Sequence, residues 1–137
     1  MPHPVAFHVL SRAEAERYEP RGAEACISIG DPEAAPAQLS PAFVAVLRLA
    51  FNDIVADPGP GDVLFGPEHA GEIIRFIERC PSLDRIVVHC GAGVSRSPGV
   101  ALGVSEAFGW PVLVLERSFP GWNRLVRSAI RDYAARR

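Results

Sequence analysis

One stretch, residues 85–98, constrains the fold of this chain more than any other part of the sequence. It begins with the apolar run Ile86-Val87-Val88, and such a run of β-branched residues predicts a buried strand. A glycine-bearing loop from Cys90 to Arg96 follows. The segment from Ser97 to Phe108 is predicted to be a helix, since a proline lies in its first turn and a glycine directly follows it. The pattern places a cysteine at the end of a strand and an arginine at the mouth of a helix.

The loop in this stretch has the features of an anion-binding site. Backbone N–H groups of such a loop, together with a helix N-terminus, can surround an oxyanion. Arg96 can add a planar fork of donors that binds two phosphate oxygens at once. The same positive field favours the thiolate of Cys90, so we expect this cysteine to be more acidic than a free one and nucleophilic at neutral pH. Gly91 and Gly93 permit a close approach of the backbone to the anion. The loop is therefore predicted to hold a phosphate against a thiolate.

The motif His89-Cys90-x5-Arg96-Ser97 resembles the signature of cysteine-dependent protein tyrosine phosphatases. With Gly93 and Pro98 in place it is similar to the dual-specificity branch of that superfamily. The resemblance implies a single dual-specificity-like phosphatase domain over residues 1–137. It also implies a phosphatase-type three-layer sandwich.

Strands alternate with helices along the chain, which predicts an α/β fold with a central, mostly parallel β-sheet flanked by helices. Ser11 and Glu14 have the spacing of a capping box and predict a short helix that runs to about Tyr18. The segment 110–115 is ambiguous between a strand and a short helix. The other expected strands and helices are the strands Val5–Leu10, Ala25–Ile29, Phe43–Phe51 and Arg85–His89, and the helices Pro67–Arg79 and Arg124–Arg137.

Composition sets the class of protein. A chain of 137 residues with 48% hydrophobic content suits one domain with a single core. The formal net charge of −2 does not favour nucleic acid as a partner. Its short, interrupted apolar runs predict no membrane span, and its N-terminus lacks the pattern of a secretory signal. We therefore expect a cytoplasmic protein, and a monomer.

Three cysteines make an odd count and predict no disulfide framework. Cys26 and Cys80 are interpreted as structural residues of the core, although Cys80 could in principle resolve an oxidised Cys90 as a disulfide. The arginines of the last helix, Arg124, Arg127 and Arg131, are interpreted as a solvated helix face.

The resemblance implies an aspartate that protonates the leaving oxygen and later activates water. Asp53 is the favoured candidate, because it follows a predicted strand as Asn-Asp, as in dual-specificity members. Asp57 and Asp62 in the adjoining Pro/Gly-rich loop are the competitors. The alternative for each is an aspartate that bonds the backbone of its own turn.

The resemblance also assigns roles around the loop. Cys90 would attack phosphorus, and Ser97 would stabilise the thiolate as it leaves. His89 would tune the site by hydrogen bonds around the loop, and Asn123 would buttress the loop. No metal or cofactor is expected. The phosphate oxygens would be held by Arg96 and by the N–H groups of Gly91, Ala92, Gly93, Val94, Ser95 and Arg96.

The implied substrate is a phosphorylated protein or a small phosphoester, with phosphotyrosine in protein as the leading choice and phosphoserine or phosphothreonine as the alternative. Gly91, Ala92, Val94 and Ser95 carry no basic side chains, which disfavours polyphosphorylated inositol lipids and RNA ends. Two rival functions stay open. One is a phosphopeptide-binding pseudophosphatase with little turnover. The other is a sulfurtransferase of the rhodanese type, although those loops usually lack the Gly-x-x-Arg-Ser ending found here.

Overall fold

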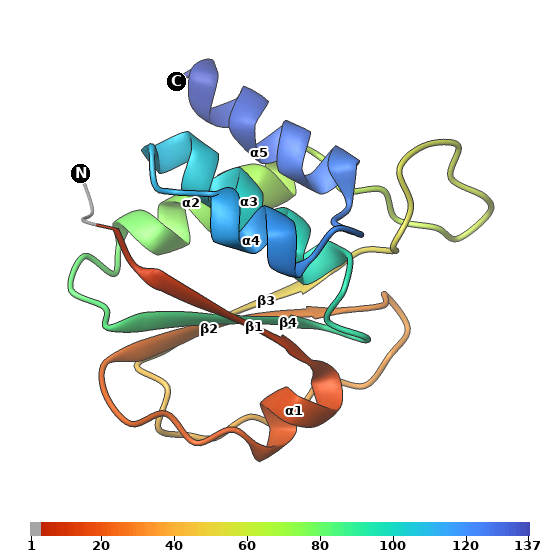
Figure 1. Cartoon of the computed structure of the whole chain (residues 1–137). Coiled ribbons are helices and arrows are strands. Elements are labelled where there is room, and N and C mark those ends of the chain that lie inside the picture. The colour runs from red at the N-terminus through yellow and green to blue at the C-terminus, as the bar shows by residue number, and fades with distance from the viewer. Residues whose placement is uncertain (1–3) are drawn as a thin grey trace.

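The computed structural model describes residues 4–137. Strands and helices alternate through most of the chain, and the last three elements are helices (Figure 1). The elements are β1 (Ala6–Ser11), α1 (Arg12–Arg17), β2 (Glu24–Gly30), β3 (Ala45–Ala50), α2 (Pro67–Glu78), β4 (Arg85–Cys90), α3 (Arg96–Phe108), α4 (Leu113–Ser118) and α5 (Arg124–Ala135).

The four strands form one sheet in the order β1-β4-β2-β3, and every pairing among the described residues is parallel. The two central strands, β2 and β4, are buried along nearly their whole length, as expected for parallel strands covered on both faces. Cys90 is the last residue of β4 and pairs with Ser11, the last residue of β1. The carboxyl ends of all four strands therefore meet at one edge of the sheet, which is where ligands bind in open parallel sheets.

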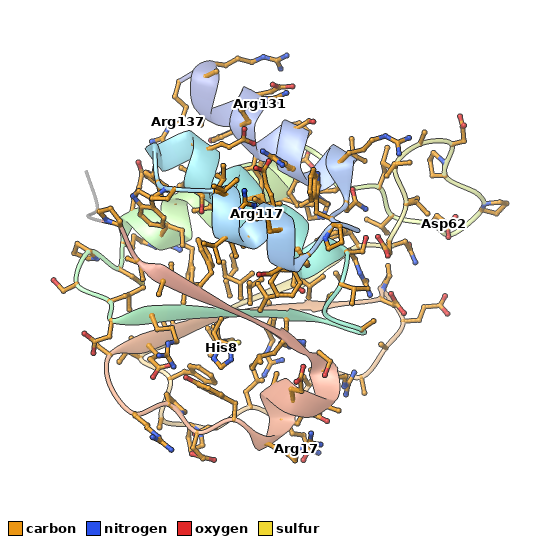
Figure 2. All side chains as sticks on the ribbon, viewed as in Figure 1. His8, Arg17, Asp62, Arg117, Arg131 and Arg137 are labelled. Atoms are coloured by element: carbon orange, nitrogen blue, oxygen red, sulfur yellow. The ribbon has the colours of Figure 1, made fainter. Side chains whose placement is uncertain are left out.

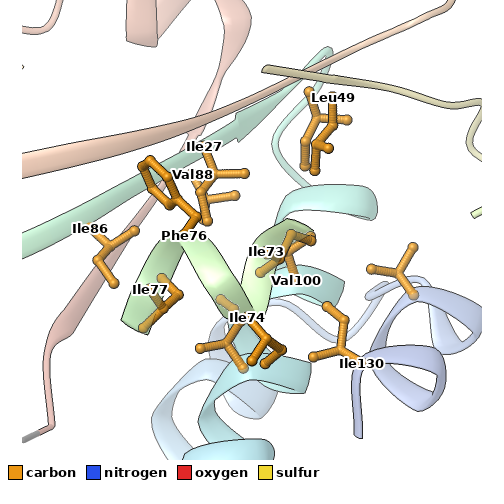
Figure 3. Close-up of a cluster of buried hydrophobic side chains, with 14 of the residues drawn as sticks. Ile27, Leu49, Ile73, Ile74, Phe76, Ile77, Ile86, Val88, Val100 and Ile130 are labelled. Atoms are coloured by element: carbon orange, nitrogen blue, oxygen red, sulfur yellow. The ribbon is translucent and has the colours of Figure 1, made fainter. Parts of the chain in front are cut away.

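Helices α2, α3, α4 and α5 cover one face of the sheet, and α1 lies on the other face (Figure 1). The main core lies between the sheet and the larger helical layer. It is made of aliphatic and aromatic side chains from the strands and from these helices (Figure 3). A smaller core on the α1 side contains Leu10, Ala15, Cys26, Phe43 and Val87. The expected three-layer α/β sandwich is thus confirmed, with α1 as the only helix of the thinner layer among the described residues.

Two glycines let α3 pack closely on α5. A Cβ added at Gly99 would lie 2.9 Å from the backbone oxygen of Asn123, and one added at Gly103 would lie 2.9 Å from the Cβ of Ile130. Val126 and Ile130 are fully buried against this side of α3. The close contact holds α3, and with it the loop that precedes α3, at a fixed distance from α5.

Most of the expected elements are present, with bounds that differ by a few residues. Ser11 caps α1 by accepting the N–H of Glu14 at 3.1 Å, and the Glu14 side chain accepts the N–H of Ser11 at 2.8 Å, so the capping box is confirmed. The ambiguous segment after Gly109 forms no strand. Its last three residues, 113–115, instead form the first turn of the short helix α4, which begins at Leu113.

The interpretation of the last helix as a solvated arginine face was wrong for Arg127. Its guanidinium forms ion pairs with Glu106 and Glu116, at 2.7 Å each, and lies 4.9 Å from the ring centroid of Trp122. Helical periodicity places Arg127 on one side of α5, but the partners come from α3 and α4, whose positions the periodicity does not give.

Within residues 4–137, no helix combines the length and apolarity needed to cross a bilayer.

Gly103→Val should destabilise the fold, because the added side chain would force α3 and α5 apart. Overpacking of this kind costs about 1–3 kcal/mol in the free energy of unfolding, which denaturant titration measures. Gly30→Val is the control, because no atom lies within 4 Å of a Cβ added there. Equal losses in the two variants would contradict the close packing of α3 on α5.

Candidate functional site

The loop between β4 and α3 surrounds a buried thiol. Cys90 is 2% exposed. Its Sγ accepts the backbone N–H of Gly93 at 3.3 Å and lies 3.1 Å from the Oγ of Ser97. Since α3 begins at Arg96, the N-terminus of that helix lies at the same loop. The sulfur therefore has two neighbours that can donate a hydrogen bond to a negative charge.

Arg96 is buried and only partly paired. Its Nη1 donates to the Oδ1 of Asp31 and to the backbone oxygen of Phe51, at 2.8 Å each. Its Nε is buried with no hydrogen-bond partner. Its Nη2 lies beside Gly91, because a Cβ added at Gly91 would be 3.4 Å from Nη2. One edge of the guanidinium is thus anchored, and the other edge, beside the loop, offers the paired donors that bind two oxygens of a phosphate.

Gly93 fixes the shape of the loop. Its φ is +77°, and a Cβ at this position would lie 2.7 Å from the carbonyl carbon of Leu10 and the nitrogen of Ser11. The loop is also bound to the start of α1, where the N–H of Arg12 donates to the oxygen of Gly91 at 3.0 Å. Only glycine combines this conformation with this contact, so the junction of β1 and α1 serves as the support for the loop.

His89 lies behind the loop, on the α1 side of the sheet. Its Nε2 is 2.6 Å from the Oγ of Ser28, and its Nδ1 is 3.3 Å from the backbone oxygen of Cys90. It lines a cavity of about 170 Å³ that Arg12 and Arg48 also line. Burial lowers the pKa of His89 below its usual value, against the opposing effect of the Cys90 carbonyl. His89 is therefore held in its neutral form at the base of the loop.

The three candidate acids lie in different surroundings. Asp53 follows β3, and its Oδ1 accepts the hydroxyl of Ser95 at 2.7 Å and the Nδ2 of Asn123 at 3.0 Å. Asp62 lies on a loop that projects from the body of the protein (Figure 2), and its Oδ2 accepts the N–H of Gly59 within that loop at 2.9 Å. Asp57 belongs to the same projecting loop, and its φ is +53°. Of the three, Asp53 is the one with a hydrogen bond to the Cys90 loop.

Asn123 connects several parts of the site. It is 3% exposed and caps α5 by accepting the N–H of Val126 at 3.0 Å. Its own N–H donates to the backbone oxygen of Ser95 at 3.0 Å. The structure therefore brings Asn123, Asp53 and the loop together, although they are far apart in the sequence.

Sequence reasoning did not identify Asp31 as a residue of the site. Asp31 directly follows β2, and its carboxylate pairs with Arg96 although 62% of the Asp31 side chain is exposed. The available signal was a polar residue directly after a buried strand. To use it, one would need the strand order, which places β2 beside β4.

The remaining cysteines lie apart from this site. Cys26 is fully buried in the smaller core, and burial raises its pKa to about 12. Cys80 lines an apolar pocket with Val44 and Leu83, near the amino ends of the strands, whereas Cys90 ends its strand at the opposite edge. This placement does not support a disulfide between Cys80 and Cys90. Within residues 4–137, His, Cys, Asp and Glu side chains form no cluster of three or more suited to a metal ion.

Comparison with solved structures finds the same fold in the crystal structure of Tk-PTP in its active form. That chain is 19% identical, the match covers 97% of this chain and 92% of that one, and the TM-score is 0.62. The core catalytic domain of the PP-IP phosphatase SIW14 from S. cerevisiae, in complex with citrate, is 15% identical with a TM-score of 0.43, over 82% of this chain and 68% of that one. No family model matches the sequence, and no curated protein does. The likeness to Tk-PTP establishes a phosphatase-type α/β sandwich.

Gly93→Ala should displace the loop, because a Cβ would collide with the backbone of β1. We expect the affinity for inorganic phosphate to fall at least about tenfold and the free energy of unfolding to fall by about 1–3 kcal/mol. Calorimetric titration measures the first and denaturant titration the second. Gly61→Ala is the matched control: φ is +81° at Gly61, but no atom lies within 4 Å of an added Cβ. An unchanged phosphate affinity in Gly93→Ala would contradict the role of this contact.

His89 should make the stability of the fold depend on pH. Because its pKa is lowered in the folded state, the unfolded chain binds the proton first as the pH falls below about 6.5. The stabilisation is therefore full above that pH and is lost progressively below it. Denaturant titrations of wild type and His89→Gln at about pH 7.5 and about pH 5 should show a steeper loss for wild type. Parallel profiles would contradict this assignment.

Proposed function

We propose that this chain is a phosphatase that hydrolyses phosphate monoesters through a phosphocysteine intermediate. The observation that carries the proposal is that one loop holds both Cys90 Sγ and the edge of Arg96 that has no hydrogen-bond partner. A buried donor without a partner is costly, and a phosphate oxygen would satisfy it. The fold shared with Tk-PTP supports the same conclusion.

In the first step the Cys90 thiolate attacks phosphorus, and a P–S bond forms as the bond to the leaving oxygen breaks. Arg96 and the N–H groups of the loop hold the equatorial oxygens, so catalysis is mainly positioning and charge stabilisation. The Asp53 carboxyl gives its proton to the leaving oxygen, which departs as an alcohol or phenol.

In the second step Asp53, now a carboxylate, takes a proton from water, and the water oxygen attacks phosphorus. The P–S bond breaks, inorganic phosphate is released and the thiolate returns. The hydroxyl of Ser97, 3.1 Å from Cys90 Sγ, would donate a hydrogen bond to the departing sulfur. His89 and Asn123 would support the loop from behind and from the side of α5.

Protein phosphotyrosine is the substrate class we propose. The loop carries no basic side chain apart from Arg96, so a single phosphate group is favoured over a polyphosphate. Val94 lies in the loop with 57% of its surface exposed, and an apolar side chain there suits contact with an aromatic ring. Tk-PTP, a protein tyrosine phosphatase, has the same fold.

Cys90→Ser should reduce kcat/KM for para-nitrophenyl phosphate, without added metal, by on the order of 10³-fold or more. Cys80→Ser is the matched control and should keep nearly full activity, because Cys80 lies at the opposite edge of the sheet. An acid quench of the wild-type reaction should leave a phosphoryl group on Cys90, detectable by mass spectrometry. Wild-type protein that binds phosphate without turnover would favour a phosphopeptide-binding module. Transfer of sulfur from thiosulfate would favour a sulfurtransferase.

A further inference from the structure

The hydroxyl of Ser95 makes no capping hydrogen bond, although Ser95 is at the N-terminus of α3. Ser95 is the N-cap of α3, where a serine usually accepts a backbone N–H of the first turn. In this structure the side chain makes no capping hydrogen bond. Instead the hydroxyl donates to the Oδ1 of Asp53 at 2.7 Å, across a separation of 42 residues. The Ser95 hydroxyl therefore binds the Asp53 carboxylate and does not cap α3.

The same carboxylate oxygen receives a second donor. Asn123 Nδ2 lies 3.0 Å from Asp53 Oδ1 and 3.2 Å from the backbone oxygen of Ile54. Since Asn123 is buried, caps α5 and donates its N–H to Ser95, it has little freedom to move. Two donors from different elements therefore fix Oδ1 of Asp53. The other oxygen, Oδ2, is left to exchange a proton with a substrate.

Hydrogen bonds between Asn52 and Val63 also fix the segment that carries Asp53. The Oδ1 of Asn52 accepts the N–H of Val63 at 2.7 Å, and the N–H of Asn52 donates to the oxygen of Val63 at 2.8 Å. These bonds close the base of the projecting loop. Asp53 directly follows Asn52 at the start of the enclosed segment, and its hydrogen bonds to Ser95 and Asn123 hold it against the Cys90 loop and the start of α5.

We infer that Ser95 and Asn123 are positioning residues for Asp53, and that the hydroxyl of Ser95 makes the phosphate-binding loop and the acid one preorganised unit. This inference rests on the proposed function. With Oδ1 occupied by two donors, the proton passes to the leaving oxygen from Oδ2. Loss of the Ser95 hydroxyl frees the carboxyl to rotate, and the acid is then misplaced while Cys90 and Arg96 keep their own contacts.

The test is a double-mutant cycle with two substrates. An acid matters more for a poor leaving group than for a good one, so phenyl phosphate is compared with para-nitrophenyl phosphate. Ser95→Ala should lower kcat/KM for phenyl phosphate roughly tenfold more than for para-nitrophenyl phosphate. In the Asp53→Asn background, where no acid is left to position, Ser95→Ala should change either rate less than about twofold. Ser95→Thr, which keeps the hydroxyl, should restore most of the loss.

A control variant separates an effect on positioning from an effect on folding. Ser11→Ala removes a serine that does cap its helix and should lower the unfolding temperature, whereas Ser95→Ala should lower it less. The inference is overturned if Ser95→Ala slows both substrates equally, or if it slows the Asp53→Asn enzyme as much as the wild type. Failure of the proposed function has a different signature, because wild type would then be inactive on both substrates and the inference would fall with it.

Discussion

The anchoring of one edge of Arg96 is the interaction on which the rest of the site depends. A guanidinium buried to 7% exposure must find partners or lose stability. Asp31 and the backbone oxygen of Phe51 supply those partners at 2.8 Å each, at the ends of β2 and β3. This edge of the side chain is therefore fixed by the sheet, and the opposite edge is left with donors at the Cys90 loop.

The sheet order explains why these partners are available. β2 lies between β4 and β3, so the carboxyl ends of three neighbouring strands meet near the start of α3. A carboxylate, a backbone carbonyl and a thiol from different parts of the chain thereby reach one location. The Asp31 side chain of this ion pair is mostly exposed, so solvent weakens the attraction between the charges. Its contribution is better understood as orientation of the guanidinium than as stability.

Local patterns in the sequence predicted the elements and the loop, because they depend on neighbours along the chain. The β-branched run before Cys90, the capping residues around Ser11 and the glycine after Phe108 are signals of this kind, and the expected elements formed there. The prediction that Asp53 and Asn123 lie near the loop came from the resemblance to phosphatases. It could not have come from periodicity, which gives no distance between separate elements.

The features that the sequence did not predict all depend on tertiary placement. Asp31 reaches Arg96 only because β2 is next to β4. Arg127 finds its two glutamates only because α3 and α4 lie beside α5. Only the backbone N–H of Ser95 was assigned a role from the sequence, since a residue that precedes an arginine at a helix start gives no sign of a side-chain partner 42 residues away.

The closure between Asn52 and Val63 divides the chain into a part that must keep its shape and a part that is free to vary. Asp53 and Ile54, at the start of this segment, are held by hydrogen bonds from Asn123 and belong to the fixed part. The residues after them, 55–62, return to the body at nearly the point where they left it, so their number does not set the position of β3 or α2. Exposed segments of this kind tolerate insertions, deletions and chain breaks better than any other part of a domain. In this protein such changes would alter what surrounds an incoming substrate while leaving the thiol, the guanidinium and the carboxyl in register, so the segment is a natural place for related chains to diverge in length.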